Sequence, residues 1–292
     1  MEVGTNTVDA GNQLMKGGGR NNNGCARVMR GIPTCPSKPV TRPHAELVRK
    51  ELQIKSLTPI LGGGTTTSRL DRHSFVRGGT IRGLLRYWWR ACRVDTSFKE
   101  LTNSEQELFG AASQPGRLAL SLGDVAATPV ARNYRFPDVV RFPFMGKGAA
   151  DINQESAMIS FTLRLDYPQQ YEQEIEDALW AWSNFGGIGM RTRRGAGALV
   201  VSDYAPDSTG MLTERLKKLC QGASQSSWSI LSPRVFYGPV SPDAGSAWDS
   251  VTQKLFEFRQ YPYGRVAQRG RSRWPEADSI RRITCQSVPR HA

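Results

Sequence analysis

Glycine and arginine are concentrated in one short segment, GGIGMRTRRGAGAL, which spans residues 186–199. Glycine lets a backbone turn tightly and approach a ligand closely, and arginine guanidinium groups bind phosphate through two parallel hydrogen bonds. The segment lacks the GxxxxGK(S/T) pattern of a P-loop. We interpret it as a loop that cradles a nucleic-acid backbone; the alternative is a glycine-rich hairpin whose arginines face water. The residues that carry this interpretation are Gly187, Gly189, Arg191, Arg193 and Arg194.

A second basic segment runs from Arg69 to Arg93 and holds seven arginines against a single acidic residue, Asp71. Solvent-exposed charged faces normally mix both signs, so a row of almost one sign repels itself unless an anion lies on it. This segment therefore predicts an anionic partner, with a solvated helix face as the alternative. Its candidate phosphate-binding residues are Arg77, Arg82, Arg86, Arg90 and Arg93.

The third basic segment, GRVAQRGRSRWPEADSIRR, covers residues 264–282. Arginine beside an aromatic side chain can pair with phosphate and stack on a base, although Trp274-Pro275 could equally form a packing corner. The candidate RNA-binding residues here are Arg269, Arg271 and Arg273. We expect arginines from two segments that are distant in sequence to converge in one cationic trough once the chain is folded. Arg86 and Arg193 represent the two segments.

The composition is strongly basic and excludes several classes of protein. Lys and Arg total 39 against 26 Asp and Glu, which gives a formal net charge of +13 over 292 residues. Thirty of the 39 are arginine, which suits a nucleic-acid partner, although a GC-rich genome would also favour arginine codons. No stretch approaches the roughly 18 apolar residues that cross a bilayer, and no apolar signal segment is present. We expect no membrane association.

Cysteine and histidine are too few and too scattered for a metal centre. The five cysteines contain no CxxC pair, which argues against a disulfide framework or a zinc site and favours a reducing cytoplasm. With only three histidines, a multi-histidine site is not expected. The sequence therefore predicts a cytoplasmic protein with no metal and no cofactor.

The hydrophobic pattern predicts the elements that must position these segments. A short strand leads to Ile60 and stops at three glycines. Further along, the pattern predicts helices at 80–93 and 169–184 and strands at 118–122, 159–165 and 198–201. The order strand–helix–strand–strand–helix–strand predicts an α+β fold of the ferredoxin-like (RRM-like) type, with helices on one face of an antiparallel sheet. In the first helix we expect Trp88 in the core and Trp89 at the border of the arginine row.

Three regions are expected along the chain. Residues 1–46 contain GGGRNNNG and no sustained periodicity, so they are interpreted as a disordered leader or as the product of a misplaced start codon. Residues 47–205 form the ferredoxin-like domain, with an irregular insertion at 125–156. Residues 225–292 are too few for a complete second copy and are interpreted as a partial second module. Its helix would carry Trp248, Val251, Leu255 and Phe258 in register.

Five motifs, in order, resemble those of RAMP proteins of type III CRISPR–Cas systems, most closely subunit one of the type III-B Cmr complex: TPILGGG, TIRGLLRYWWRACR, ELFG, GGIGMRTRRGAGAL and GRSRWPEADSIRR. The resemblance covers roughly Leu52 to Arg282. It implies ferredoxin-like RAMP modules that bind RNA. It also implies a non-catalytic subunit of a crRNA-guided antiviral ribonucleoprotein, which contacts crRNA and target RNA near the 3′ end of the guide and adjoins other RAMP subunits.

The same resemblance marks the loop after the first strand, where backbone RAMPs carry a cleaving Asp and processing RAMPs carry a His. Metal-independent RNA cleavage needs a base near a 2′-hydroxyl and stabilisation of the developing charge. The alternative function is therefore a crRNA-processing or target-cleaving endoribonuclease that uses Asp71 or His73. We expect instead that Asp71 pairs with Arg69 or Arg72 and orders the loop, and that no residue is catalytic.

Overall fold

The computed structural model describes residues 46–66, 68–94, 97–141, 144, 151–221, 228, 231–238, 240–260 and 283. The expected leader, except for its last residue, lies outside the described residues, and so does the third basic segment with Arg269, Arg271 and Arg273. Within the described part of the chain, no helix combines the length and the apolar character needed to cross a membrane.

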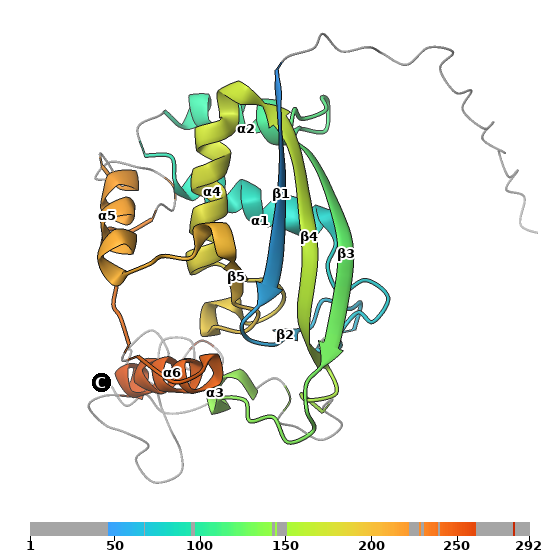
Figure 1. The fold of residues 1–292 in the computed structure, drawn as a ribbon, viewed down its shortest axis with the longest axis vertical. Coiled ribbons are helices and arrows are strands. Elements are labelled where there is room, and N and C mark those ends of the chain that lie inside the picture. Colours follow the sequence, from blue (N-terminus) through green and yellow to red (C-terminus); the bar gives the residue numbers. More distant parts are fainter. Residues whose placement is uncertain are drawn as a thin grey trace, which may run out of the picture. The chain divides into compact units, whose positions relative to one another are not determined.

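One antiparallel sheet forms the centre of the fold (Figure 1). Its strands are β1 (Leu47–Ser56), β2 (Ile60–Leu61), β3 (Ala119–Pro129), β4 (Ser156–Pro168) and β5 (Leu199–Val201). The long strand β4 pairs with β1, β2 and β3, and β1 pairs with β5, which gives the order β5–β1–β4–β3. The prediction of a mixed fold built on an antiparallel sheet is confirmed. Strand β3 continues to Pro129, so the first five residues of the expected insertion extend this strand.

Helices α1 (Gly78–Ala91) and α4 (Glu172–Phe185) pack together and cover one face of the sheet (Figure 1). The strands supply this core because apolar and polar residues alternate along them. In β1, Leu52 and Ile54 are buried, and Ile159, Phe161 and Leu163 of β4 join them. The opposite face of the sheet carries ion pairs such as Arg164 with Glu51.

The remaining elements surround this two-layer core. The longer ones are α2 (Phe98–Phe109), α5 (Thr209–Leu219) and α6 (Ala244–Gln260). Short ones are α3 (Asp138–Arg141), η2 (Gln169–Tyr171), η3 (Thr192–Arg194) and η4 (Ser202–Tyr204). In Figure 1, α2 lies near one end of the sheet and α6 near the other. Helices α2 and α6 therefore lie at opposite ends of the sheet.

The prediction for the tryptophan pair is wrong. Trp89 is 1% exposed, whereas Trp88 is only partly buried. The buried face of α1 repeats every four residues, with Ile81, Leu85 and Trp89. Helix α4 determines which face of α1 is buried. The indole of Trp89 donates a hydrogen bond of 2.8 Å to Glu174 Oε2 on α4.

Helix α6 packs through a second, smaller apolar cluster. Trp248 is 6% exposed and joins Leu61, Phe136, Val140, Ile152 and Ala196 in that cluster. The register expected for this helix is wrong at Val251, which is 53% exposed, whereas Thr252 is buried. The cluster includes residues of β2, of α3 and of the segment at 186–199, so α6 packs against residues of the expected 47–205 domain.

Candidate nucleic-acid interface

The segment at residues 186–199, here called the glycine loop, is fixed by backbone hydrogen bonds. Ile188 N–H donates to Gly197 O (2.9 Å), which closes the loop on itself. Met190 N–H donates to Leu61 O (2.7 Å), and Gly197 N–H donates to Pro59 O (2.9 Å). These bonds hold the loop on the connection between β1 and β2, so its conformation is set before any ligand arrives.

Thr58 adds a side-chain bridge that sequence reasoning missed. Its hydroxyl donates to Gly195 O (2.6 Å) and accepts from Ala198 N–H (2.9 Å). The residue is 4% exposed, so this hydroxyl satisfies two backbone groups that are shielded from water. A threonine directly before a proline, in the TPILGGG motif, was the available signal.

Two arginines of the loop are available for a ligand. The side chains of Arg191 and Arg193 form no hydrogen bond or ion pair with any described residue. Arg191 has φ of 66° and directly precedes η3, and Arg193 is exposed. Unpaired guanidinium groups on a fixed backbone can bind phosphate without first breaking an internal ion pair.

Helix α6 contacts the same loop from the side. The indole N–H of Trp248 donates to the carbonyl oxygen of Arg194. A Cβ atom on Gly195, where φ is +79°, would lie 2.7 Å from Trp248 Cδ1. Glycine is therefore required for this close approach. Sequence reasoning assigned Trp248 to a separate module and missed this contact.

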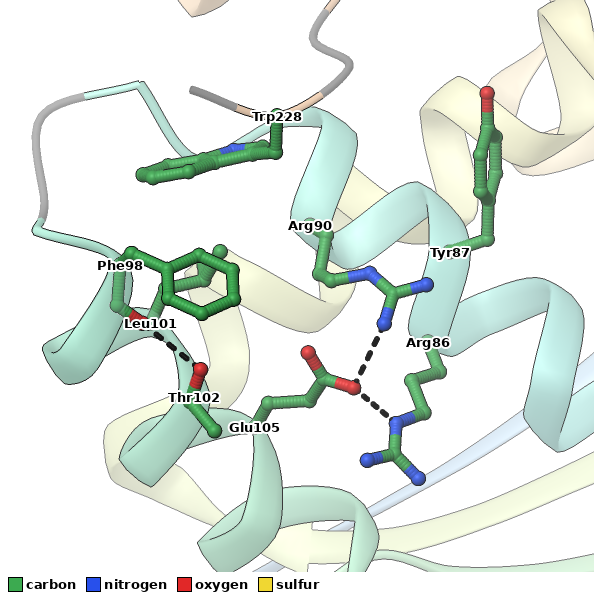
Figure 2. Close-up of a pocket in the computed structure, with 8 residues that line it drawn as sticks. All are labelled: Arg86, Tyr87, Arg90, Phe98, Leu101, Thr102, Glu105 and Trp228. Carbon is green, nitrogen blue, oxygen red and sulfur yellow. Dashed lines mark hydrogen bonds and ion pairs between the residues drawn. The ribbon is translucent and has the colours of Figure 1, made fainter. Parts of the chain in front are cut away.

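Two arginines of α1 pair with a carboxylate of the same chain. Arg86 Nε and Arg90 Nη1 both donate to Glu105 Oε1 on α2, the second at 2.9 Å (Figure 2). Glu105 is 6% exposed, so one buried carboxylate faces two cations. Arg82 donates to two backbone carbonyls, those of Phe109 (3.0 Å) and Leu118 (2.9 Å).

Arg93, at the end of the row, is bound by α4. Its guanidinium pairs with Glu174 and lies 5.1 Å from the ring centroid of Trp89. Both contacts keep it against the helix pair, where its side chain is only 21% exposed. Arg82 and Arg93 therefore serve packing in this structure, and Arg86 and Arg90 retain partly exposed side chains.

The loop before α1 is ordered by carboxylates. Asp71 Oδ1 accepts from His73 N–H (3.0 Å) and Ser74 N–H (3.1 Å), and Oδ2 pairs with Arg77. The hydrogen bond from Arg77, followed by those from the two backbone N–H groups, lowers the pKa of Asp71 below its ordinary value. Both oxygens are occupied, so Asp71 is poorly placed to take a proton from RNA.

The expected partners of Asp71 were wrong. Arg69 pairs instead with Glu155 Oε1 (2.7 Å), and Arg72 lies 3.9 Å from the same oxygen. Glu155 Oε2 also accepts from Leu70 N–H (2.9 Å). Burial by itself raises the pKa of Glu155, but the hydrogen bonds from Leu70 and Arg69 outweigh it and lower the pKa overall. The spacing of charged residues within the loop could not reveal this pairing, because Glu155 is 86 residues from Arg69 in sequence and directly precedes β4.

The glycine loop contacts α1 at its first residue, Gly186. A Cβ on Gly186, at the start of the glycine loop, would lie 2.8 Å from Trp88 Nε1. Arg86 and Arg90 lie two residues from Trp88 in sequence, which is about 160° around a helix. They face α2, near one end of the sheet, whereas the loop arginines neighbour α6, near the other (Figure 1). The expected convergence of Arg86 and Arg193 in one cationic trough stays a prediction.

Comparison with known proteins identifies the family. The sequence profile of the RAMP superfamily matches residues 53–200, which is half of the chain and includes β2 to β4 and the glycine loop. The chain belongs to the RAMP superfamily. The resemblance inferred from the five motifs is confirmed.

Two curated relatives come from Pyrococcus furiosus. The chain is 23% identical over 152 residues to "CRISPR system Cmr subunit Cmr1-1", covering 48% of this chain and 45% of that protein. It is 22% identical over 176 residues to "CRISPR system Cmr subunit Cmr1-2", covering 51% of this chain and 92% of that protein. The matched part therefore spans less than half the length of the first relative.

One solved structure shares the fold. The crystal structure of Cmr1 from Pyrococcus furiosus (apo form) superposes with a TM-score of 0.54, at 18% identity, over 84% of this chain and 78% of that chain. At this identity the likeness establishes the common architecture. It extends beyond the residues that the superfamily profile matches.

Proposed function

We propose that this chain is a non-catalytic RNA-binding subunit of a type III-B CRISPR (Cmr) effector complex. In this role it contacts crRNA and target RNA near the 3′ end of the guide and adjoins other RAMP subunits. Membership of the RAMP superfamily and the two Cmr relatives support the assignment. The observation that carries it is the glycine loop, in which Arg191 and Arg193 have no partner among the described residues.

The topology supports a ferredoxin-like RAMP module over residues 47–205. The strand order β5–β1–β4–β3 is that of a split βαβ arrangement, and α1 and α4 lie on one face of the sheet. We propose further that residues 225–292 belong to a partial second module whose helix α6 packs on the first. Contacts to phosphate from the glycine loop would give affinity without base discrimination.

The geometry of the loop at Asp71 favours a non-catalytic role over the endoribonuclease alternative. Both carboxylate oxygens accept hydrogen bonds from within the loop. Incubation of the purified chain with repeat RNA in EDTA tests this alternative. We expect no discrete cleavage; cleavage that is lost in Asp71→Ala or His73→Ala would establish the nuclease instead.

The binding role is tested by removing the two unpaired arginines of the loop. We expect the double variant Arg191→Ala/Arg193→Ala to bind short single-stranded RNA more weakly, for all sequences alike, in fluorescence anisotropy titrations. Each lost phosphate contact lowers the slope of log affinity against log salt by about 0.7, so the pair lowers it by about 1.4.

The matched control is Lys217→Ala/Lys218→Ala, which removes two charges from the exposed part of α5. Its slope of log RNA affinity against log salt should equal that of the wild type, because lysines that do not contact the RNA phosphates release no counterions on binding. An unchanged slope in the arginine variant would contradict the glycine loop as the RNA-binding site.

A further inference from the structure

A cleft of about 440 Å³ opens between α1 and α2 (Figure 2). This volume is in the range of small-molecule sites. Its walls combine aromatic and charged side chains: Arg86, Tyr87, Arg90, Phe98, Glu105 and Trp228. Arg86 and Arg90 are candidate phosphate-binding residues from the sequence, whereas Tyr87, Phe98, Glu105 and Trp228 have no role in the proposed function.

Two aromatic rings form one side of the cleft. Phe98 is 65% exposed, which is unusual for so large an apolar side chain at the start of a helix. Its position is fixed by Ser97, which caps α2 by accepting a hydrogen bond from Glu100 N–H. Trp228 faces Phe98 with ring centroids 6.4 Å apart and a tilt of 45°, so the rings diverge. The indole of Trp228 is held by a hydrogen bond to Arg93 O (3.0 Å).

The other side of the cleft is charged. Glu105 Oε1 accepts from both Arg86 and Arg90, so two positive charges share one negative charge. Its second oxygen, Oε2, accepts no hydrogen bond from a described residue and points into the cleft (Figure 2). The Glu105 side chain is only 8% exposed. Oε2 is therefore open to a hydrogen-bond donor that enters the cleft.

We propose that this cleft binds a single nucleotide of RNA, and this inference rests on the RNA-binding function proposed above. The base stacks on the exposed face of Phe98 beside Trp228, and its exocyclic amino group donates to Glu105 Oε2. The phosphate pairs with Arg86 and Arg90, which neutralises the remaining positive charge. A nucleotide supplies a flat ring, a hydrogen-bond donor and an anion, whereas an apolar peptide would leave the guanidinium groups and Glu105 Oε2 without a partner.

The test uses the full chain and separates a flat ring from apolar area alone. Phe98→Leu keeps an apolar side chain but removes the ring, and Phe98→Tyr keeps the ring. We expect Phe98→Leu to bind short single-stranded RNA at least about fivefold more weakly and Phe98→Tyr to bind as the wild type. The matched control is Phe236→Leu, since Phe236 is 94% exposed and lies outside the cleft.

Photocrosslinking locates the base. RNA that carries 6-thioguanosine, a photoactivatable base that keeps an exocyclic amino group, should crosslink to peptides that contain Phe98 or Trp228. Circular dichroism and urea unfolding check that each variant is folded.

The outcomes distinguish this inference from the proposed function. If the wild type binds RNA but Phe98→Leu binds equally well and no crosslink maps to the cleft, the nucleotide site is refuted and the proposed function stands. If Phe98→Leu instead weakens only assembly with other subunits, the cleft is a protein-docking site and the inference is wrong. If the wild type does not bind RNA, the proposed function and this inference both fail.

Discussion

The indole N–H of Trp248 donates a hydrogen bond to the backbone carbonyl of Arg194, so α6 and the glycine loop are joined across 54 residues of sequence. The same ring lies against Gly195, where a side chain would collide with it. Arg193 precedes this contact by one residue, and Arg191 directly precedes the same turn. A helix near the C-terminal end of the described chain therefore helps to set where the loop arginines point.

This contact predicts a graded loss of stability at Trp248. Trp248→Phe keeps a ring in the second apolar cluster but removes the N–H donor, so the free energy of unfolding should fall by about 1 kcal/mol. Trp248→Ala also leaves a cavity and should cost about 3–5 kcal/mol. Urea unfolding measures both variants.

The control for this series is Val251→Ala, on the exposed side of the same helix. It should change the free energy of unfolding by less than about 0.5 kcal/mol. RNA affinity should fall with Trp248→Ala and stay unchanged with Val251→Ala. Wild-type stability in both Trp248 variants would show that α6 does not stabilise the loop.

Periodicity in the sequence was enough to predict the core strands and helices, because apolar residues repeat clearly in β4 and α4. It failed at Trp88 and Trp89. Two adjacent tryptophans carry the same hydrophobicity, so only the position of α4 and its residue Glu174 decides which ring is buried. That information lies 85 residues away in sequence.

Only the parts of the candidate site that are clustered locally in the sequence could be predicted. Gly195 and its neighbouring arginines were evident because residue types cluster locally. Glu105 and Thr58 were missed because each acts on a segment that is distant in sequence. The same reason explains the arginine row: a local window shows one sign of charge, and the compensating carboxylate comes from the next helix.

Glu105→Gln should destabilise the chain, because it removes the charge that holds Arg86 and Arg90 together. The side chains of Arg86 and Arg90 are 37% and 40% exposed, so solvent screens part of the repulsion between their guanidinium groups. We expect the free energy of unfolding to fall by about 1–2 kcal/mol in urea titrations.

Added salt should reduce this penalty, because screening weakens the repulsion between the two cations. The matched control is Glu107→Gln, whose pair with Arg117 is about half exposed on both sides. Its effect should stay below about 1 kcal/mol. Equal effects of the two variants would contradict a special role for the buried carboxylate.

Asp71 should make the stability of its loop depend on acid pH. Its pKa is lowered below the ordinary value of 3.8, chiefly by the hydrogen bond from Arg77. A carboxyl whose folded pKa is lowered stabilises the fold above its unfolded pKa, and this contribution is lost as the pH falls through the folded value. The difference in unfolding free energy between the wild type and Asp71→Asn should therefore be largest at neutral pH and shrink below about pH 4.

The matched control is Glu100→Gln, whose carboxylate also has a lowered pKa but caps α2 instead of the loop. Hydrogen exchange of the Ser74 backbone amide separates the two sites, because this amide donates to Asp71. It should lose protection in Asp71→Asn and keep it in Glu100→Gln. Equal protection in the two variants would show that Asp71 does not order the loop.

Cys92 should resist alkylation while the chain is folded. Burial, followed by the nearby Asp177 carboxylate, raises the pKa of Cys92 to about 12. Its thiol also donates to the backbone carbonyl of Asp177 at 3.6 Å. Because the thiolate is the reactive form, iodoacetamide at pH 8 should modify Cys92 far more slowly in the native chain than in urea. Peptide mass spectrometry resolves this site from Cys220, whose pKa is also raised by burial. Modification of native Cys92 at the unfolded rate would mean that α1 and α4 do not hold the thiol between them as the structure describes.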